Sequence, residues 1–417
     1  MKKILSLVLF FTALFSFAQN RKEIGDQFIK LLFIDNNTEK AYTFFDPEMA
    51  KHVTPEVFKT LPEQLEGQFG NFKNVIEVNN ESDAYYYYSE FEKEKLDILI
   101  NFTDSNKIIG FFLVPHKNFD KPDDKTALRI KSDSIELKGT LLEPEENNQK
   151  KLVILVHGSG ASDRDETIGE NKPFRDIAEY LLKNGISSYR YDKRTNSNPE
   201  AFNEKSTVEQ ETINDAVNVS NYFKNNEKFK DYQIIILGHS LGAYLMPKIA
   251  EKANASKYVF MAGNARPLQD VLLRQFEYLH SIDPSNVSEK DLQDMKKKVD
   301  FLNSKKFNLN TPKEELPMVL SAAYWKYLVD YKPLESVKLI KVPMFFAQGG
   351  MDYQVIAKDY VLWKEQLKNN KLAEFKFYQP LGHLFIKISG TPSPKNYEIK
   401  GNVDGGFLKD LVQFILK

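Results

Sequence analysis

Cysteine is absent from this chain of 417 residues. Its absence excludes disulfide bonds, zinc–thiolate sites and cysteine nucleophiles. Neither sign of charge dominates, because the formal net charge at pH 7 is -1. The chain therefore lacks a basic field for nucleic acid, and we expect no nucleic-acid partner. It also has neither an H-E-x-x-H motif nor a dinucleotide-binding glycine motif, so we expect no metal and no cofactor.

Long apolar runs are also scarce, and the one with a targeting character lies at the start of the chain. Lys2 and Lys3 precede the almost wholly apolar residues 4–17, and the small residue Ala18 follows. This pattern is typical of a secretory signal peptide. We predict a signal peptide over residues 1–18, cleavage after Ala18, and a secreted or periplasmic protein without stable membrane insertion. The alternative is an uncleaved anchor, although the run is short for a membrane span.

Residues 20–118 predict a small α+β domain, because helical spacing comes first and strand patterns follow. The expected helices cover residues 24–34 and 54–68, and the expected strands cover 74–78, 84–91, 95–102 and 107–115. We interpret Tyr85 to Tyr88 as alternating core and surface residues of a strand rather than as a sugar-binding platform. Residues 40–47 and 68–72 resemble the small domain of uncharacterised role that precedes hydrolase domains in some secreted bacterial proteins.

A polar segment over residues 119–125 is the expected linker to a second domain over residues 126–417. There, apolar strand patterns alternate with amphipathic helices, which predicts an α/β fold with a doubly wound, mostly parallel sheet and a mixed start. The expected strands cover 126–130, 135–142, 151–156, 186–192, 234–237, 258–262, 342–348 and 373–378, and the helices between them cover 173–183, 207–225, 241–252, 357–368 and 406–416.

Residues 264–338 interrupt this alternation. They contain helical patterns over 268–282, 289–302 and 314–328 and no clear strand. An insertion of this kind between parallel strands lies over their carboxyl ends, so we expect a helical cap. Its aromatic residues, Phe276, Tyr278, Tyr324, Trp325 and Tyr327, either line a substrate cleft or hold the cap together.

The motif GHSLG at residues 238–242 lies between a predicted buried strand and a predicted helix. This is the context of the G-x-S-x-G nucleophile elbow, in which a tight turn needs glycine two residues before and two residues after the serine. The turn exposes the serine hydroxyl and leaves the next backbone N–H near the reacting atoms. Ser240 is therefore the candidate nucleophile, and the N–H of Leu241 is a candidate oxyanion donor.

A serine hydroxyl needs a base, and the base needs a third group to orient it. Of the six histidines, His383 follows the last expected core strand, so it lies at the same sheet edge as Ser240. Asp352 follows the strand before it, after Gly349 and Gly350, and it is the candidate acid. The rival acids are Asp330 and Asp359, but neither follows a strand. The remaining histidines are His52 and His116 in the first domain, His157 after an early strand, His239 in the elbow and His280 in the cap.

A second oxyanion donor comes from a loop after an early strand in elbows of this kind. The motif HGSG at residues 157–160 follows the strand that ends at Val156, and its glycines allow the backbone to approach a substrate. We therefore assign the N–H of Ser159 and the N–H of Leu241 as the two donors of the oxyanion hole.

Taken together, these four motifs resemble the α/β-hydrolase superfamily over residues 126–417. Residues 162–166 (SDRDE) and 191–194 (YDKR) are similar to a subgroup of secreted bacterial esterases related to serine aminopeptidase and dienelactone-hydrolase-like enzymes. We expect the charged residues of these two segments to form ion pairs that brace the oxyanion loop: Asp163, Arg164, Asp192 and Arg194. The alternative for Arg164 is contact with a substrate carboxylate.

The leading functional hypothesis is a serine hydrolase that cleaves small-molecule carboxylic esters through an acyl-enzyme intermediate. A serine peptidase with the same triad is the alternative, with cap acids such as Glu277 or Glu289 holding a free chain terminus. A third hypothesis is a non-catalytic binding protein on the same fold. The sequence leaves open the acyl and alcohol groups, the role of the first domain and the oligomeric state.

Overall fold

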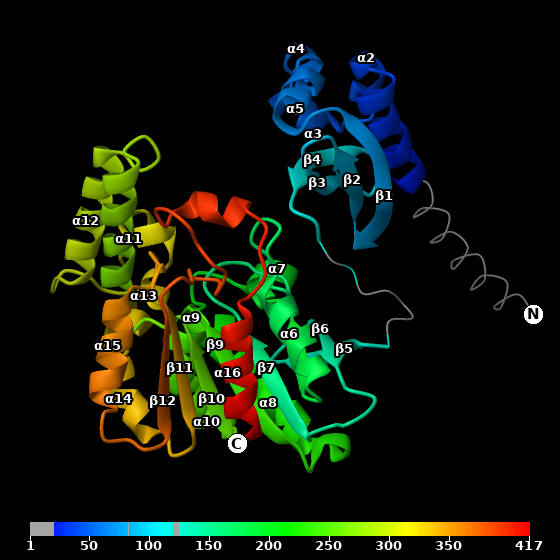
Figure 1. The fold of residues 1–417 in the computed structure, drawn as a ribbon. Coiled ribbons are helices and arrows are strands. Elements are labelled where there is room, and N and C mark those ends of the chain that lie inside the picture. The colour runs from blue at the N-terminus through cyan, green and yellow to red at the C-terminus, as the bar shows by residue number, and fades with distance from the viewer. Residues whose placement is uncertain (1–20, 82, 118, 120–124) are drawn as a thin grey trace, which may run out of the picture. The chain divides into compact units, whose positions relative to one another are not determined.

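The computed structural model describes residues 21–417 except 82, 118 and 120–124. The expected signal peptide and most of the expected linker lie outside the described residues. The chain divides into two compact units, Met1–Phe119 and Asp120–Lys417 (Figure 1). Each unit has its own buried core.

The first unit begins with a helix over residues 21–29 and then four short helices. The first helix continues as the π-helical turn η1 (Lys30–Ile34), and the short ones are α2 (Thr38–Tyr42), α3 (Pro47–His52), α4 (Pro55–Lys59) and α5 (Leu61–Phe69). The single helix expected over residues 54–68 is thus two helices, because Pro62 has no N–H to donate to Phe58. Helix α3 is not among the expected helices, although Asp46 and Pro47 begin it as an N-cap and first-turn proline.

A four-stranded antiparallel sheet completes this unit, in the order β1-β2-β3-β4. Its strands are β1 (Phe72–Glu81), β2 (Ala84–Phe91), β3 (Lys95–Phe102) and β4 (Ile108–Val114). Tyr85 and Tyr87 are buried, whereas Tyr86 and Tyr88 are half-buried. This alternation confirms that the tyrosine run is a strand with one face in the core.

The second unit is built on an eight-stranded sheet in the order β12-β11-β10-β9-β7-β8-β6-β5. Its strands are β5 (Ala127–Ser132), β6 (Ile135–Leu142), β7 (Lys151–Val156), β8 (Ser187–Tyr191), β9 (Gln233–His239), β10 (Lys257–Met261), β11 (Met344–Gly349) and β12 (Ala373–Tyr378). Strands β7 to β12 pair in parallel, while β6 is antiparallel to β8 and to β5. The predicted mostly parallel sheet with a mixed start is confirmed.

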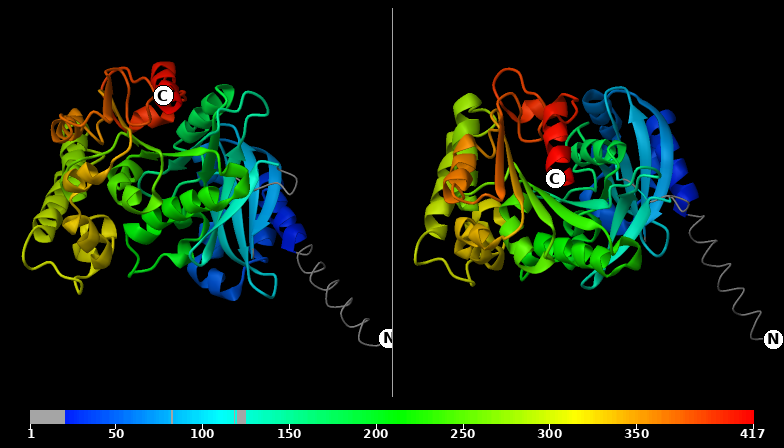
Figure 2. Two further views of the ribbon diagram at one scale, coloured as in Figure 1. Left: turned by 90° about the horizontal axis from the view of Figure 1, so that it is seen from below. Right: turned by 60° about the horizontal axis from the view of Figure 1, so that its bottom comes forward.

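Helices cover both faces of this sheet, because alternate residues of each buried strand point to opposite sides. Val153 and Leu155 of β7 pack with α6 (Pro173–Lys183) and α16 (Gly405–Leu416). Leu152 and Ile154 pack in the other core, with α8 (Asn214–Asn225), α10 (Met246–Ala253) and α15 (Ala357–Gln366). The right view of Figure 2 shows α16 in red on one face of the sheet and the green helices α8 and α10 on the other.

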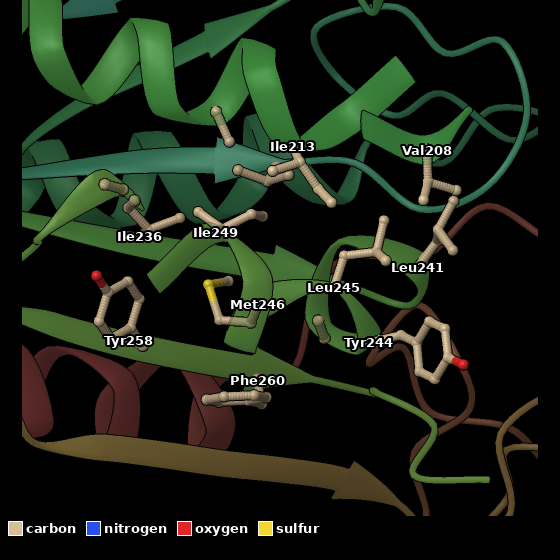
Figure 3. Close-up of a cluster of buried hydrophobic side chains, with 14 of the residues drawn as sticks. Val208, Ile213, Ile236, Leu241, Tyr244, Leu245, Met246, Ile249, Tyr258 and Phe260 are labelled. Carbon is tan, nitrogen blue, oxygen red and sulfur yellow. The ribbon is translucent and has the colours of Figure 1, made fainter. Parts of the chain in front are cut away.

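Two of the expected helices of the second unit are interrupted. The helix expected over 241–252 is α9 (Leu241–Tyr244) followed by α10, because Pro247 cannot donate to the carbonyl of Ala243. The helix expected over 207–225 starts with the π-helical turn η3 (Glu209–Ile213) before α8. Figure 3 shows how Leu241, Leu245 and Ile249 still reach one core beside Ile236 and Phe260.

The cap contains α11 (Leu268–Ile282) and α12 (Glu289–Leu302) with the expected bounds. In Figure 1 they rise beyond the end of the sheet at which α9 lies. The third expected helix has the wrong bounds, because the structure places 3-10 turns η5 (Lys313–Glu315) and η6 (Pro317–Val319) before α13 (Ala322–Asp330). Ser321 caps α13 by accepting the N–H of Tyr324, so the helix starts late. No helix in the described part of the chain has both the length and the apolar character to span a membrane.

Candidate active site

Ser240 lies in a strained turn between β9 and α9, with φ 51° and ψ -114°. Residues other than glycine rarely adopt a positive φ, so the surrounding structure must hold the backbone of Ser240 in this conformation. The two glycines of the motif allow the turn to close. A Cβ on Gly238 would lie 2.5 Å from the carbonyl carbon of Gly242, and one on Gly242 would lie 2.5 Å from the carbonyl oxygen of Val156. Ser240 itself is half-buried, so part of the residue is accessible to solvent.

The carboxylate of Asp352 contacts the ring of His383. Nδ1 of His383 lies 2.8 Å from Oδ2 of Asp352, and both residues are buried. The other oxygen of Asp352 accepts the backbone N–H groups of Gln354 at 2.8 Å and Val355 at 2.9 Å. Gln348 donates to Oδ2 at 3.2 Å. These contacts fix the carboxylate, and the carboxylate fixes the orientation of the His383 ring.

The loops that carry these two residues are packed backbone to backbone. The N–H of Met351 donates to the carbonyl of Leu381 at 2.9 Å, and a Cβ on Gly349 would lie 2.3 Å from the same carbonyl oxygen. The rival acids are placed elsewhere. Asp330 pairs with Lys326 on the surface, and Asp359 binds Arg266 at 2.7 Å.

The structure brings the His383 loop beside the nucleophile elbow through the residue before the serine. His239 Nε2 lies 3.0 Å from the carbonyl oxygen of His383, and the two imidazole rings are 4.6 Å apart between centroids. Within the described residues, the structure contains no hydrogen bond between the Ser240 hydroxyl and the His383 ring. Such bonds are often long without substrate and tighten when it binds.

The loop over residues 157–160, which is predicted to supply an oxyanion donor, lies against Ser240. A Cβ on Gly158 would lie 3.1 Å from Cβ of Ser240 and 3.6 Å from its Oγ, so a side chain at this position would crowd the serine. Ser159 is exposed, whereas Leu241 is buried. Within the described residues, the N–H groups of Ser159 and Leu241 have no protein acceptor. Both donors therefore remain available to a substrate oxygen.

Two buried charged residues that the sequence did not single out hold the peptide groups of Gly158. Oε1 of Glu166 accepts the N–H of Gly158 at 2.6 Å, and Nζ of Lys193 donates to its carbonyl at 2.7 Å. Glu166 lies in the segment SDRDE and Lys193 in the segment YDKR, in which the sequence predicted ion pairs for other charged residues. Their contacts with Gly158 form only where separate loops meet in the fold, so the spacing of residues along the sequence could not predict them.

The expected ion pairs are only partly present. Arg164 pairs with Asp192 at 2.7 Å and also donates to Thr140, so its buried guanidinium is occupied by protein groups. The expectation for Arg194 is wrong. Arg194 begins the short helix α7 (Arg194–Ser197), which carries its side chain to Asp215 and Asp133 and away from the oxyanion loop.

Asp163 and His157 order the oxyanion loop from within it. The Asp163 carboxylate accepts the N–H of Thr167 at 2.9 Å and that of Asp165 at 3.2 Å. The ring of His157 lies 2.9 Å from the carbonyl oxygen of Asp163. Burial lowers the pKa of His157, so its neutral ring donates a hydrogen bond to this carbonyl at neutral pH. His157 is therefore a loop-packing residue.

A buried ion pair joins the oxyanion loop to the elbow. Nδ1 of His239 lies 2.9 Å from Oε2 of Glu166. Burial disfavours the charged form of each group, but their mutual attraction outweighs it. The pKa of His239 is accordingly raised, and the pKa of Glu166 is lowered.

The cap touches the site on the side of Asp352. Tyr278 of α11 stacks on Tyr353, with 5.7 Å between ring centroids, and its hydroxyl donates to the carbonyl of Pro392 at 2.8 Å. Tyr324 and Trp325 are buried in the core, so these two aromatic residues hold the cap together.

A cavity of about 410 Å³ lies on the side of the His383 loop. Its lining includes His383, Leu384, Lys387, Tyr397 and Asp404, and Ser240 is not among its lining residues.

The two cap acids of the peptidase hypothesis, Glu277 and Glu289, lie on different helices of the cap. Glu289 at the start of α12 lies 3.2 Å from His280, and Glu277 is exposed on α11. Among the described residues, no three histidine, aspartate or glutamate side chains are grouped to hold a metal ion. The absence of a cofactor stays a prediction.

The first unit matches a family of proteins of unknown function (DUF3887) over residues 26–111. The chain as a whole is similar to the esterase EstD of Thermotoga maritima, with 30% identity over 395 residues. That match covers 91% of this chain and 92% of EstD, so it takes in both units.

Solved esterase structures also resemble this chain, at lower identity. Est1E from Butyrivibrio proteoclasticus has 17% identity and a TM-score of 0.45, with 70% of this chain and 96% of that chain covered. The Pyrococcus furiosus esterase Pf2001 has 16% identity and a TM-score of 0.43, with 69% and 89% covered. Since both TM-scores are below 0.5, the family assignment rests on the match to EstD.

Proposed function

This chain belongs to the α/β-hydrolase esterases and is an esterase-like hydrolase, and we propose that it cleaves carboxylic esters with a Ser240–His383–Asp352 triad. The observation that carries the proposal is the 2.8 Å contact between His383 and Asp352 beside the strained elbow of Ser240. A buried carboxylate with its remaining oxygen satisfied by backbone N–H groups is suited to hold an imidazole as a base.

In the proposed reaction, Oγ of Ser240 attacks the ester carbonyl carbon while Nε2 of His383 takes the hydroxyl proton. The carbonyl oxygen becomes an oxyanion that accepts hydrogen bonds from the N–H groups of Ser159 and Leu241. His383 then gives its proton to the alcohol oxygen as the carbon–oxygen bond breaks, which leaves an acyl group on Ser240. Water, deprotonated by His383, attacks the acyl group, and the carboxylic acid leaves as the serine regains its proton.

Turnover of short p-nitrophenyl esters by wild type and by Ser240→Ala tests this proposal. We expect the substitution to reduce kcat by at least about 10³-fold, because the acyl-enzyme can no longer form. Ser285→Ala, at an exposed serine in the loop between the cap helices, is the matched control and should keep wild-type turnover. A fluorophosphonate should label wild type and leave Ser240→Ala unlabelled. Equal rates of wild type and Ser240→Ala would reject the triad.

The same assay separates ester from peptide chemistry. We propose that small-molecule esters are the substrates, so p-nitrophenyl acetate and butyrate should be turned over faster than aminoacyl p-nitroanilides under matched conditions. Faster release from the anilides would favour the peptidase alternative. Feruloyl esters extend the screen to larger acyl groups.

We also propose that residues 1–18 direct export and are removed. The charged start and apolar run of this segment support the proposal. Mass spectrometry of the protein recovered from a bacterial host should show Gln19 as the first residue. A chain that keeps Met1 and stays with the membrane fraction would favour the anchor instead.

A further inference from the structure

The peptide groups on both sides of Gly158 are held by buried charges. Glu166 accepts the N–H of Gly158 at 2.6 Å, and the ammonium group of Lys193 donates to its carbonyl at 2.7 Å. Glu166 and Lys193 are 4% and 1% exposed, so neither contact is exchanged easily for water. Hydrogen bonds to charged groups are stronger than those between neutral groups. The backbone of Gly158 is therefore held firmly on both sides.

Holding the carbonyl of Gly158 also fixes the N–H of Ser159, because the two belong to one planar peptide group. In a trans peptide the C=O and N–H bonds point in opposite directions. A donor that anchors the oxygen on the protein side therefore keeps the N–H turned to the other side. A cation on the oxygen also polarises the amide and makes its N–H a stronger donor.

The ammonium group of Lys193 is linked to the cap through Glu211. Its Nζ lies 2.5 Å from Oε1 of Glu211 in η3, and the hydroxyl of Tyr324 in α13 donates to Oε2 of Glu211 at 2.5 Å. All three side chains are buried. The backbone N–H of Lys193 adds a further tie to the oxyanion loop, since it donates to the carbonyl of Ser162 at 3.0 Å.

We propose that Lys193 is a positioning residue that aims the N–H of Ser159 into the oxyanion hole, and that the cap, through Tyr324 and Glu211, holds Lys193 in place. This inference rests on the proposed esterase function and adds a role that the triad does not include. It makes the rate of ester cleavage depend on a cap residue that needs no contact with substrate.

The sharpest test replaces the buried pair as a unit, with the double variant Lys193→Met/Glu211→Met. Removing only Lys193 would leave Glu211 buried and unpaired, whereas replacing both charges by apolar side chains is often neutral for stability. We expect kcat for p-nitrophenyl butyrate to fall about 10- to 100-fold, because loss of a whole oxyanion donor costs about 10²- to 10³-fold and this donor is only misaligned. KM should stay within about twofold, since the contact matters mainly in the transition state.

A trifluoromethyl ketone gives a second readout that a general loss of structure would not produce. Addition of Oγ of Ser240 to its carbonyl carbon creates an oxyanion in the same hole, so its affinity should fall by the same factor as kcat. The carboxylate product, which makes no tetrahedral oxyanion, should bind the double variant as it binds wild type.

Lys257→Met is the matched control. Lys257 is a buried lysine that also donates to backbone carbonyls, those of Phe414 and Ile415 at 2.9 Å each, but it lies at the amino end of β10. This variant should lose stability and keep wild-type kcat. Tyr324→Phe, which removes one hydroxyl from the chain of contacts, should lower kcat by about threefold.

A folded double variant with wild-type kcat and wild-type affinity for the ketone would overturn the role of Lys193. A wild-type kcat in Tyr324→Phe would overturn the role of the cap. The proposed function fails separately, because in that case Ser240→Ala would match wild type before any of these variants is compared.

Discussion

At the scale of single residues, the contact between Asp352 and His383 carries a direct prediction. Asp352→Asn keeps the size of the side chain but replaces the acceptor next to Nδ1 of His383 with a group that can donate. The imidazole then takes the wrong tautomer, and we expect kcat for p-nitrophenyl esters to fall about 10⁴-fold. Asp330→Asn, at the rival acid on the cap, should leave kcat unchanged. Ester turnover of the two variants side by side checks the assignment.

The ion pair between His239 and Glu166 predicts a pH dependence of stability. The raised pKa of His239 means that protonation stabilises the fold, fully below its unfolded value of about 6.5 and progressively less as pH rises through the higher folded value. The lowered pKa of Glu166 sets the acid limit, because its contribution is present above about 4.5 and is lost as pH falls through the folded value.

His239→Gln should therefore destabilise the protein most between these limits. At about pH 6 we expect the free energy of unfolding to fall by about 3 kcal/mol, since Glu166 loses its buried partner, and the difference should shrink towards about pH 9. Urea denaturation at both pH values measures this change. His280→Gln, which removes a more exposed histidine next to Glu289, should cost less than about 1 kcal/mol at either pH. A pH-independent cost of His239→Gln would contradict the ion-pair account.

Site residues that belong to a local sequence motif could be predicted from the sequence at this scale. Ser240, Asp352 and His383 each follow a strand, so the GHSLG motif and the order of the strands were enough to propose them. Glu166 and Lys193 could not be proposed in this way, because their roles arise only where separate loops meet. Arg194 was misassigned for the same reason.

At the scale of elements, one buried side chain, that of Asn171, binds three backbone groups of the segment over residues 397–401. Nδ2 of Asn171 donates to the carbonyls of Tyr397 and Ile399 at 2.9 Å and 3.2 Å, and its Oδ1 accepts the N–H of Gly401 at 2.8 Å. This segment lines the cavity beside His383. Asn171 therefore stabilises the backbone that forms one wall of that cavity.

Asn171→Ala leaves these backbone groups without a partner, and we expect the free energy of unfolding to fall by about 1–3 kcal/mol. Hydrogen exchange should speed up at Gly401, whose N–H loses its acceptor. Asn396→Ala, in the neighbouring turn, is the control and should leave exchange at Gly401 unchanged. Unaltered exchange in Asn171→Ala would show that the segment is held by other contacts.

Strands were predicted more accurately than helix boundaries, for a physical reason. The buried run of β7 and the alternating tyrosines of β2 are marked in the sequence by their own burial pattern, so both strands have the expected bounds. Prolines at residues 62 and 247 divide helices whose apolar spacing continues across the break. The π-helical turns at η1 and η3 leave no comparable mark in the sequence.

At the scale of the whole molecule, all residues of the candidate site come from the second unit, and each unit has a separate core. We expect residues 125–417 expressed alone to fold and to keep at least about half of the wild-type kcat for p-nitrophenyl esters. Circular dichroism and ester turnover check this expectation. A folded fragment with no turnover would instead assign the first unit a part in catalysis.

The backbone of Ser240 has a consequence for how an inactive form of this enzyme would behave on heating. Residues forced to positive φ carry strain of about 1–3 kcal/mol, and alanine keeps that strain whereas glycine does not. Glycine also makes the unfolded chain more flexible, which costs about 0.5–1 kcal/mol. Ser240→Gly should therefore melt at a higher temperature than Ser240→Ala. The difference between the two melting temperatures would measure the thermal stability that the protein loses by holding its nucleophile in a strained, exposed turn.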